Sequence, residues 1–166
     1  TCALPISIAS YTEATTIRRQ PGLERDLAST LTNLGVAYLT QAELGKEPVA
    51  NLERAIASYT EATTIRRQPG LERDLAQTLT NLGNAYSTQA ELGKEPVANL
   101  ERAIASYTEA TTIRRQPGLE RDLATTLTNL GVAYSTQAQL GKEPVANLER
   151  AIDRKSTRLN SSHLVI

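Results

Sequence analysis

Apolar residues in this chain recur at helical rather than strand spacing. Between residues 23 and 44 they are separated by three or four positions, which places them on one face of a helix. They are Leu23, Leu27, Leu31, Leu34, Tyr38 and Ala42. Pro21 and Gly22 precede this segment and Gly45 follows it, as expected of helix ends. We predict a first helix near residues 23–44.

A second apolar stripe follows after a short polar turn. Its members are Leu52, Ala55, Ile56, Tyr59, Ala62 and Ile65. We expect this helix to begin near residues 48–51 and to end at Arg66 and Arg67, before Gln68 and Pro69. Basic residues favour the carbonyl end of a helix, and the residue before a proline resists helical geometry.

The two stripes recur with a period of 48 residues, because the segment YTEATTIRRQPGLERDLA begins at Tyr11, Tyr59 and Tyr107. Between residues 8 and 152 only four columns differ among the copies. They hold Ser29, Gln77 and Thr125; Val36, Asn84 and Val132; Leu39, Ser87 and Ser135; and Glu43, Glu91 and Gln139. A single helix pair of this kind cannot bury its own stripe, so tandem copies must stack. We predict an all-α solenoid of antiparallel helix pairs over residues 8–152.

Gly35, Gly83 and Gly131 lie in the middle of the first helices, where glycine costs about 1 kcal/mol relative to alanine. Because each flanks the apolar stripe, we interpret them as places where a neighbouring helix packs on bare backbone. The alternative is a tolerated, neutral glycine.

The amino-acid composition excludes several classes of function. Eighteen Lys and Arg balance eighteen Asp and Glu, so no basic field favours nucleic acid as a partner. The only cysteine is Cys2 and the only histidine is His163, which excludes disulfides, Cys/His zinc clusters and Cys–His or Ser–His catalysis. No apolar run reaches the roughly 18 residues that span a bilayer, and no signal peptide is present. We expect a cytoplasmic protein that is not an enzyme and needs no metal or cofactor.

The two ends depart from the repeat. Ser7 stands where the copies have Ala55 and Ala103, and Asp153 stands in an alanine column. Codons for residues 1–6 can be read on the opposite strand as codons for residues 153–158, and the shared string resembles a sequencing adapter. We therefore expect residues 1–7 and 153–166 to be adapter-derived, the tail to be disordered, and the repeats to be an internal part of a longer protein. Sequencing the source gene across both junctions tests this expectation.

The stripes resemble the motif of tetratricopeptide repeats. The matching positions in the first copy are Leu34, Gly35, Tyr38, Ala55, Tyr59 and Ala62, with Leu31 where tryptophan is usual. The period of 48 residues exceeds the family's typical 34 or so, which implies longer helices and a wider turn at GKEP. The resemblance implies a right-handed superhelix whose concave groove binds a protein segment. Similar long repeats occur in bacterial signalling proteins, some of which carry a caspase-like domain at the C-terminal end.

By this resemblance, the variable columns and a neighbouring asparagine of each first helix line the concave groove. The candidate contacts are Ser29, Asn33, Val36, Leu39, Gln77, Asn81, Asn84, Ser87, Thr125, Asn129, Val132 and Ser135. An asparagine amide can pair with the N–H and C=O of a peptide backbone at once. None of these positions holds the lysine or arginine of a carboxylate clamp, so we expect an extended or helical protein segment as the partner. The alternative is that near-identical copies drift on a solvated face.

Paired arginines occur once per repeat, as Arg18 with Arg19 and at the equivalent positions of the later copies. We expect them to complement helix C-termini and to meet Glu24 or Asp26. The alternative is that they hold an acidic partner.

Two functions therefore stay open at this stage. The first is a protein-interaction scaffold without catalysis, and the second is the sensor arm of a larger enzyme, such as a caspase-like protease, encoded beyond residue 152. We also expect the array, which lacks polar capping repeats, to fray at its ends and to self-associate through them.

Overall fold

The computed structural model describes residues 3–141 and residue 150 of the chain. Within these residues it contains helices and no strand. The helices are α1 (Ala3–Arg18), α2 (Glu24–Glu43), α3 (Pro48–Arg66), α4 (Glu72–Glu91), α5 (Pro96–Arg114) and α6 (Leu123–Gln139). Each packs against its neighbours along the chain, so the predicted all-α solenoid is confirmed. The predicted disordered tail, residues 153–166, lies outside the described part of the chain.

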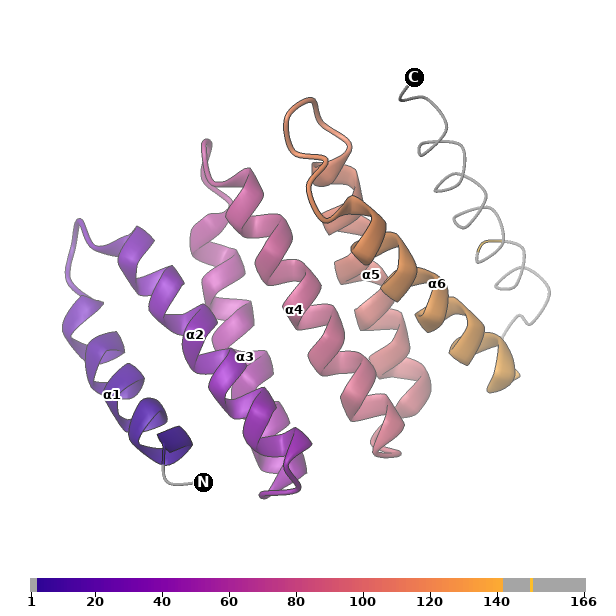
Figure 1. The fold of residues 1–166 in the computed structure, drawn as a ribbon, viewed down its shortest axis with the longest axis horizontal. Helices are drawn as coiled ribbons and strands as arrows, with labels where there is room; N and C mark the ends of the chain where they lie inside the picture. The colour runs from indigo at the N-terminus through magenta and orange to yellow at the C-terminus, as the bar shows by residue number, and fades with distance from the viewer. Residues whose placement is uncertain (1–2, 142–149, 151–166) are drawn as a thin grey trace.

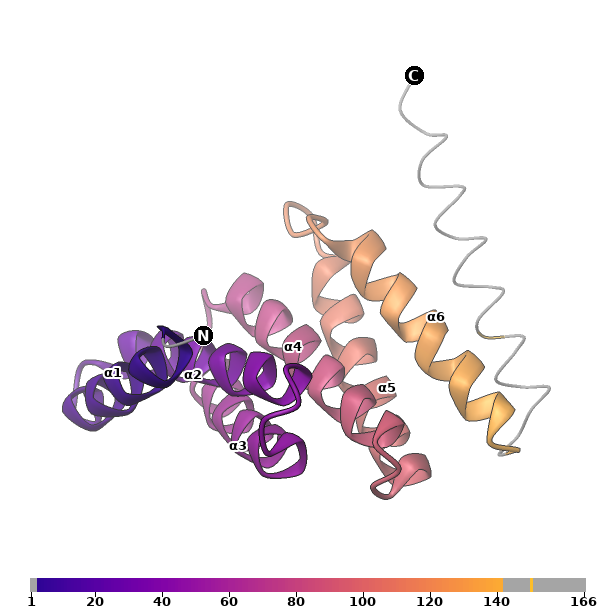
Figure 2. The ribbon, with the colours of Figure 1, turned by 60° about the horizontal axis from the view of Figure 1, so that its bottom comes forward.

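The helices form two layers (Figure 1). The first helices of the pairs, α2, α4 and α6, lie side by side in one layer, with α3 and α5 behind them. The helix axes turn progressively along the array from α2 to α6 (Figure 2). Helix α1 shares its sequence with the end of a second helix and packs on α2 accordingly. We call the surface formed by α2, α4 and α6 the first-helix face.

A left-handed glycine ends each first helix. Gly45 has φ of 75°, and its N–H donates to the carbonyl of Ala42 at 2.9 Å while the N–H of Lys46 donates to the carbonyl of Gln41 at 3.0 Å. These two bonds satisfy carbonyls that the helix leaves unpaired. Pro48 then opens α3 at a position where no N–H is needed.

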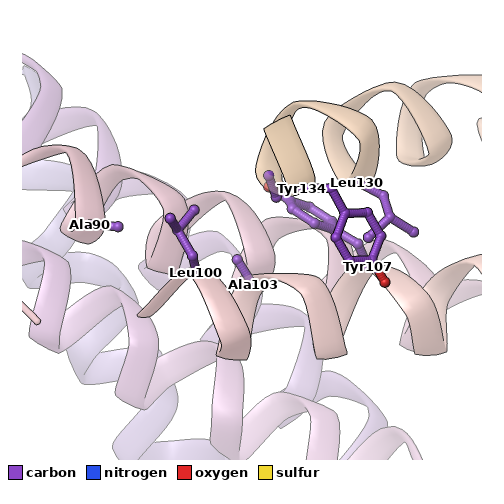
Figure 3. Packing of buried hydrophobic residues seen from close by; sticks show 7 residues of the cluster. Ala90, Leu100, Ala103, Tyr107, Leu130 and Tyr134 are labelled. Atoms are coloured by element: carbon purple, nitrogen blue, oxygen red, sulfur yellow. The ribbon is translucent and has the colours of Figure 1, made fainter. Parts of the chain in front are cut away.

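Each second helix buries one face between two first helices. Leu52, Ala55 and Tyr59 of α3 pack with Leu82 and Ala85 of α4. The equivalent residues of α5 pack against α6, where Tyr107 lies beside Leu130 and Tyr134 (Figure 3). Neither tyrosine of the second helices is more than 2% exposed, so both rings are part of the core.

Two of the three mid-helix glycines contact these tyrosines. A Cβ at Gly35 would lie 2.6 Å from the ring of Tyr59, and one at Gly83 would lie 2.5 Å from the ring of Tyr107. The packing interpretation is therefore confirmed at both glycines. At Gly131 no described atom lies within 4 Å of a Cβ, and the residues equivalent to the tyrosine-bearing helix lie outside the described part of the chain, so the interpretation stays a prediction there.

Helix α6, the first helix of the third pair, begins later in its repeat than α2 and α4 begin in theirs. Helices α2 and α4 begin at Glu24 and Glu72, whereas α6 begins at Leu123 and is preceded by Asp122 with φ of 62°. The segment PGLERDLA is the same in all three copies. In the first copy, the start of the helix packs on Ala62 and Ile65 of α3. Positions 158 and 161, the equivalents in the third copy, hold arginine and serine and lie outside the described part of the chain.

Candidate functional site

The structure places all twelve predicted contacts on α2, α4 and α6, where they are exposed or half-buried. The central column of the first-helix face holds Val36, Asn84 and Val132, and the two valines are 44% and 58% exposed. Asn84, between them in the same column, is half-buried. The candidate positions of this face therefore hold apolar and neutral polar side chains. They come from the first helices of three consecutive pairs.

Asn84 connects three helices. Its side-chain Oδ1 accepts a hydrogen bond from the hydroxyl of Tyr107 at 2.7 Å and another from Nδ2 of Asn129 at 3.0 Å. The Tyr107 hydroxyl also lies 3.4 Å from Oγ of Ser87. Burial raises the pKa of Tyr107 to about 12, so the phenol stays neutral and can donate at neutral pH.

The equivalent place on α2 makes none of these bonds. Val36 and Leu39 replace the asparagine and the serine, and the buried hydroxyl of Tyr59 has no hydrogen-bond partner among the described residues. Burial raises the pKa of this phenol even further. A buried hydroxyl without a partner costs about 1–3 kcal/mol, so this part of the face carries an unsatisfied polar group.

The variable column at Ser29 and Gln77 receives a buried arginine from the following second helix. Arg66 Nη2 donates to Oγ of Ser29 at 3.3 Å, and Arg114 Nη2 donates to Oε1 of Gln77 at 2.9 Å. Gln77 in turn donates through Nε2 to Oδ1 of Asn81 at 3.2 Å. The amide of Gln77 therefore links the second-helix layer to the first-helix face.

These arginines are held by neutral groups rather than by carboxylates. Arg66 Nη1 donates to the hydroxyl of Thr32 at 2.9 Å, to the hydroxyl of Thr78 and to the carbonyl of Asp74 at 3.3 Å. Only 7% of Arg66 is exposed, and this burial lowers its pKa. Hydrogen bonds to hydroxyls and carbonyls offset part of the cost of burying the charge. The arginine thus fastens α2 to α4.

The second arginine of each pair forms a different contact from the one predicted. Arg19 pairs with Glu61 at 2.6 Å and Arg67 pairs with Glu109 at 2.5 Å, so each reaches the next second helix. The first arginine of each pair does meet the predicted aspartate, through the backbone: Arg18 Nη1 donates to the carbonyl of Asp26 at 3.4 Å. The carboxylate of Glu24 instead accepts the N–H of Gly22 at 3.0 Å, which lowers its pKa.

Sequence reasoning assigned the variable columns to a partner and missed that several of them also bind the second helices. Tyr107 and Asn84 are 23 residues apart, and Arg114 and Gln77 are 37 apart. Helical periodicity does not relate positions on different helices, so no local pattern shows these contacts. The available signal was that each second helix has a tyrosine within its apolar stripe and an arginine directly after it, as Tyr59 and Arg66 in α3. Both side chains carry polar groups that need partners when they are buried.

Two hollows lie among the helices. One of about 360 Å³ lies between α1 and α3 above Leu31, Leu34 and Tyr38 of α2, and another of about 200 Å³ is lined by Gln77 and Arg114 among others. Among the described residues no group of three His, Cys, Asp or Glu side chains is placed to hold a metal ion. No helix within that range has the length and apolarity to cross a membrane.

Comparison with known proteins adds no family: no protein-family model matches the chain, and no curated protein matches it either.

Proposed function

We propose that this helical array is a protein-interaction scaffold whose first-helix face binds a protein segment without catalysis. The observation that supports this proposal most is the presence of exposed valines beside amide groups on one face. Val36 and Val132 leave about half of their surface in water, and uncharged polar side chains occupy the neighbouring candidate positions. A neutral partner suits this surface better than a charged one.

The distribution of charge supports the same face. Five ion pairs among the described residues join the second helices and the turns, including Arg19 with Glu61 and Lys94 with Glu53. The candidate positions on α2, α4 and α6 hold only uncharged side chains. Desolvating neutral groups costs less than desolvating ions, so a partner that covers the candidate positions loses less solvation free energy than one that covers the ion pairs.

Site-specific photocrosslinking in cells that express the complete protein tests this proposal. A photoreactive phenylalanine analogue replaces Val36 or Val132 on the first-helix face. Thr60 and Thr108, exposed on the second helices α3 and α5, carry the matched control replacements. We expect crosslinks to a partner segment from positions 36 and 132 and not from positions 60 and 108. Crosslinks of equal yield from both layers, or from the second helices alone, contradict the proposal.

A further inference from the structure

The hydrogen bonds of Asn84 leave its amide nitrogen as a donor without an acceptor among the described residues. Its Oδ1 already accepts two bonds, from Tyr107 and from Asn129, and a side-chain amide oxygen has two lone pairs. No described residue accepts a bond from Nδ2 of Asn84. The half-buried asparagine can therefore bind a partner's acceptor and cannot receive a partner's donor.

Asn129 has the opposite preference. Its Nδ2 donates to Asn84 at 3.0 Å, and its Oδ1 accepts no bond from a described residue. The pair Asn84–Asn129 thus presents one donor and one acceptor from two different helices, each held in place by the bond between them. Asn81 differs, because its Oδ1 accepts from Gln77 and Val36 stands where its cross-helix partner would be.

An extended residue exposes its own N–H and C=O on the same edge of the chain. We propose that the Asn84–Asn129 pair binds one such residue: Asn84 Nδ2 donates to its carbonyl, and Asn129 Oδ1 accepts from its N–H. This inference rests on the proposed function, since it names what the first-helix face recognises. It replaces the expectation that each asparagine grips the backbone by itself.

Val36 and Val132 flank this pair and set the apolar part of the recognition. Packed helices lie about 8–10 Å apart, and hydrogen bonds such as Thr32 to Thr78 at 3.5 Å show that consecutive first helices touch. The two valines, two helices apart, are therefore separated by roughly 16–20 Å. An extended chain advances about 3.3 Å per residue, so the partner is an uncharged extended segment with two apolar side chains about five or six residues apart.

Selection from a phage-displayed library of random linear peptides on the full chain tests the inference. We expect enriched peptides to carry two apolar residues at about that spacing, and their binding to be lost with Val36→Lys or Val132→Lys. N-methylation of the single backbone amide midway between the apolar residues should weaken binding about tenfold or more, while methylation of its neighbours should change it less.

One variant separates recognition from structural support. Asn84→Asp keeps an oxygen acceptor for Tyr107 and Asn129, replaces the amide donor with a second acceptor oxygen and adds one negative charge, so the melting temperature should hold while Kd for a selected peptide rises about tenfold. Gln139→Glu, an exposed change that restores the residue of the other copies, is the charge-matched control and should leave Kd within about twofold. Tyr107→Phe removes the buried hydroxyl without altering the presented amide groups, and should also leave peptide binding in place.

The outcomes distinguish this inference from the function beneath it. Absence of any enriched peptide that the two valine variants abolish contradicts the proposed function itself. Peptides that depend on Val36 and Val132 but tolerate both Asn84→Asp and every single N-methylation overturn only the assignment of the asparagine pair.

Discussion

Two junctions of the array share one packing arrangement and differ in how they treat a buried hydroxyl. At the first, Tyr59 of α3 packs on Gly35 of α2, and at the second, Tyr107 of α5 packs on Gly83 of α4. A Cβ added at either glycine would lie almost equally close to the ring, at 2.6 and 2.5 Å. Among the described residues, only the hydroxyl at the second junction has partners, Asn84 and, at 3.4 Å, Ser87.

The comparison shows that the fold and its local polar contacts have separate determinants. Tyrosine and glycine are the same in both junctions, and they fix how closely the helices approach. Two variable positions decide the rest, because Val36 and Leu39 offer no acceptor where Asn84 and Ser87 do. We therefore expect the first junction to be the weaker one, by about the 1–3 kcal/mol that an unsatisfied buried hydroxyl costs.

The largest expected effect concerns what the two junctions share. Gly83→Leu should destabilise the protein by about 3 kcal/mol or more, because the new side chain must displace the buried ring of Tyr107 and such overpacking is costly. Gly35→Leu should cost a similar amount. Urea unfolding followed by circular dichroism measures both.

Gly131→Leu is the control, since nothing described lies within 4 Å of its Cβ. It should stay within about 1 kcal/mol of the parent, because leucine favours helix over glycine. Equal losses at positions 83 and 131 would show that the glycine contact with tyrosine does not set the helix approach.

A smaller effect should follow from converting the second junction into the first. Asn84→Val removes the acceptor of the Tyr107 hydroxyl and the bond to Asn129, so stability should fall by about 1–2 kcal/mol. Adding Tyr107→Phe to this variant should recover part of the loss, because it removes the orphaned hydroxyl. A further loss on adding Tyr107→Phe would place the cost of Asn84→Val elsewhere than at that hydroxyl.

The smallest expected effect is a difference in alkaline titration. Burial raises the pKa of both tyrosines above the ordinary value, that of Tyr107 to about 12 and that of Tyr59 further. A raised pKa means that the stabilisation is fully present below about pH 10 and is lost as pH rises toward the folded-state value. Between about pH 10 and 11, unfolding free energy should fall by about 1 kcal/mol per buried tyrosine.

Ultraviolet absorbance of the phenolate should therefore show Tyr59 ionising after Tyr107, with Tyr59→Phe removing the last step. The reverse order would mean that the Tyr59 hydroxyl is better solvated than its burial indicates.

Sequence patterns predicted the helices well because each boundary has a local cause. The first helix was expected at residues 23–44 and spans Glu24–Glu43, between a Pro–Gly turn and the left-handed Gly45. The late start of α6 could not be predicted in this way, since the same PGLERDLA sequence begins α4 three residues earlier in the repeat. What differs is the sequence of the segment that follows the third copy, from residue 153 on, which lies beyond any local window.

The candidate site was predicted only as a surface. Spacing predicted that Ser29 and Val36 lie on one face of the first helix and Asn84 on the equivalent face of the next first helix. The structure has them there. The internal bonds of Asn84 and Gln77 depend on side chains 23 and 37 residues away. Arg66 was expected only to complement the end of its helix, and its burial among threonine hydroxyls depends on contacts between separate helix pairs.

The most direct test of the account is whether an acceptor at position 36 gives the first junction what the second already has. Val36→Asn is measured by equilibrium unfolding with and without Tyr59→Phe, as a double-mutant cycle. The account predicts that Val36→Asn stabilises the chain by about 0.5–1.5 kcal/mol more when the Tyr59 hydroxyl is present than when it is absent. The same effect in both backgrounds would contradict it.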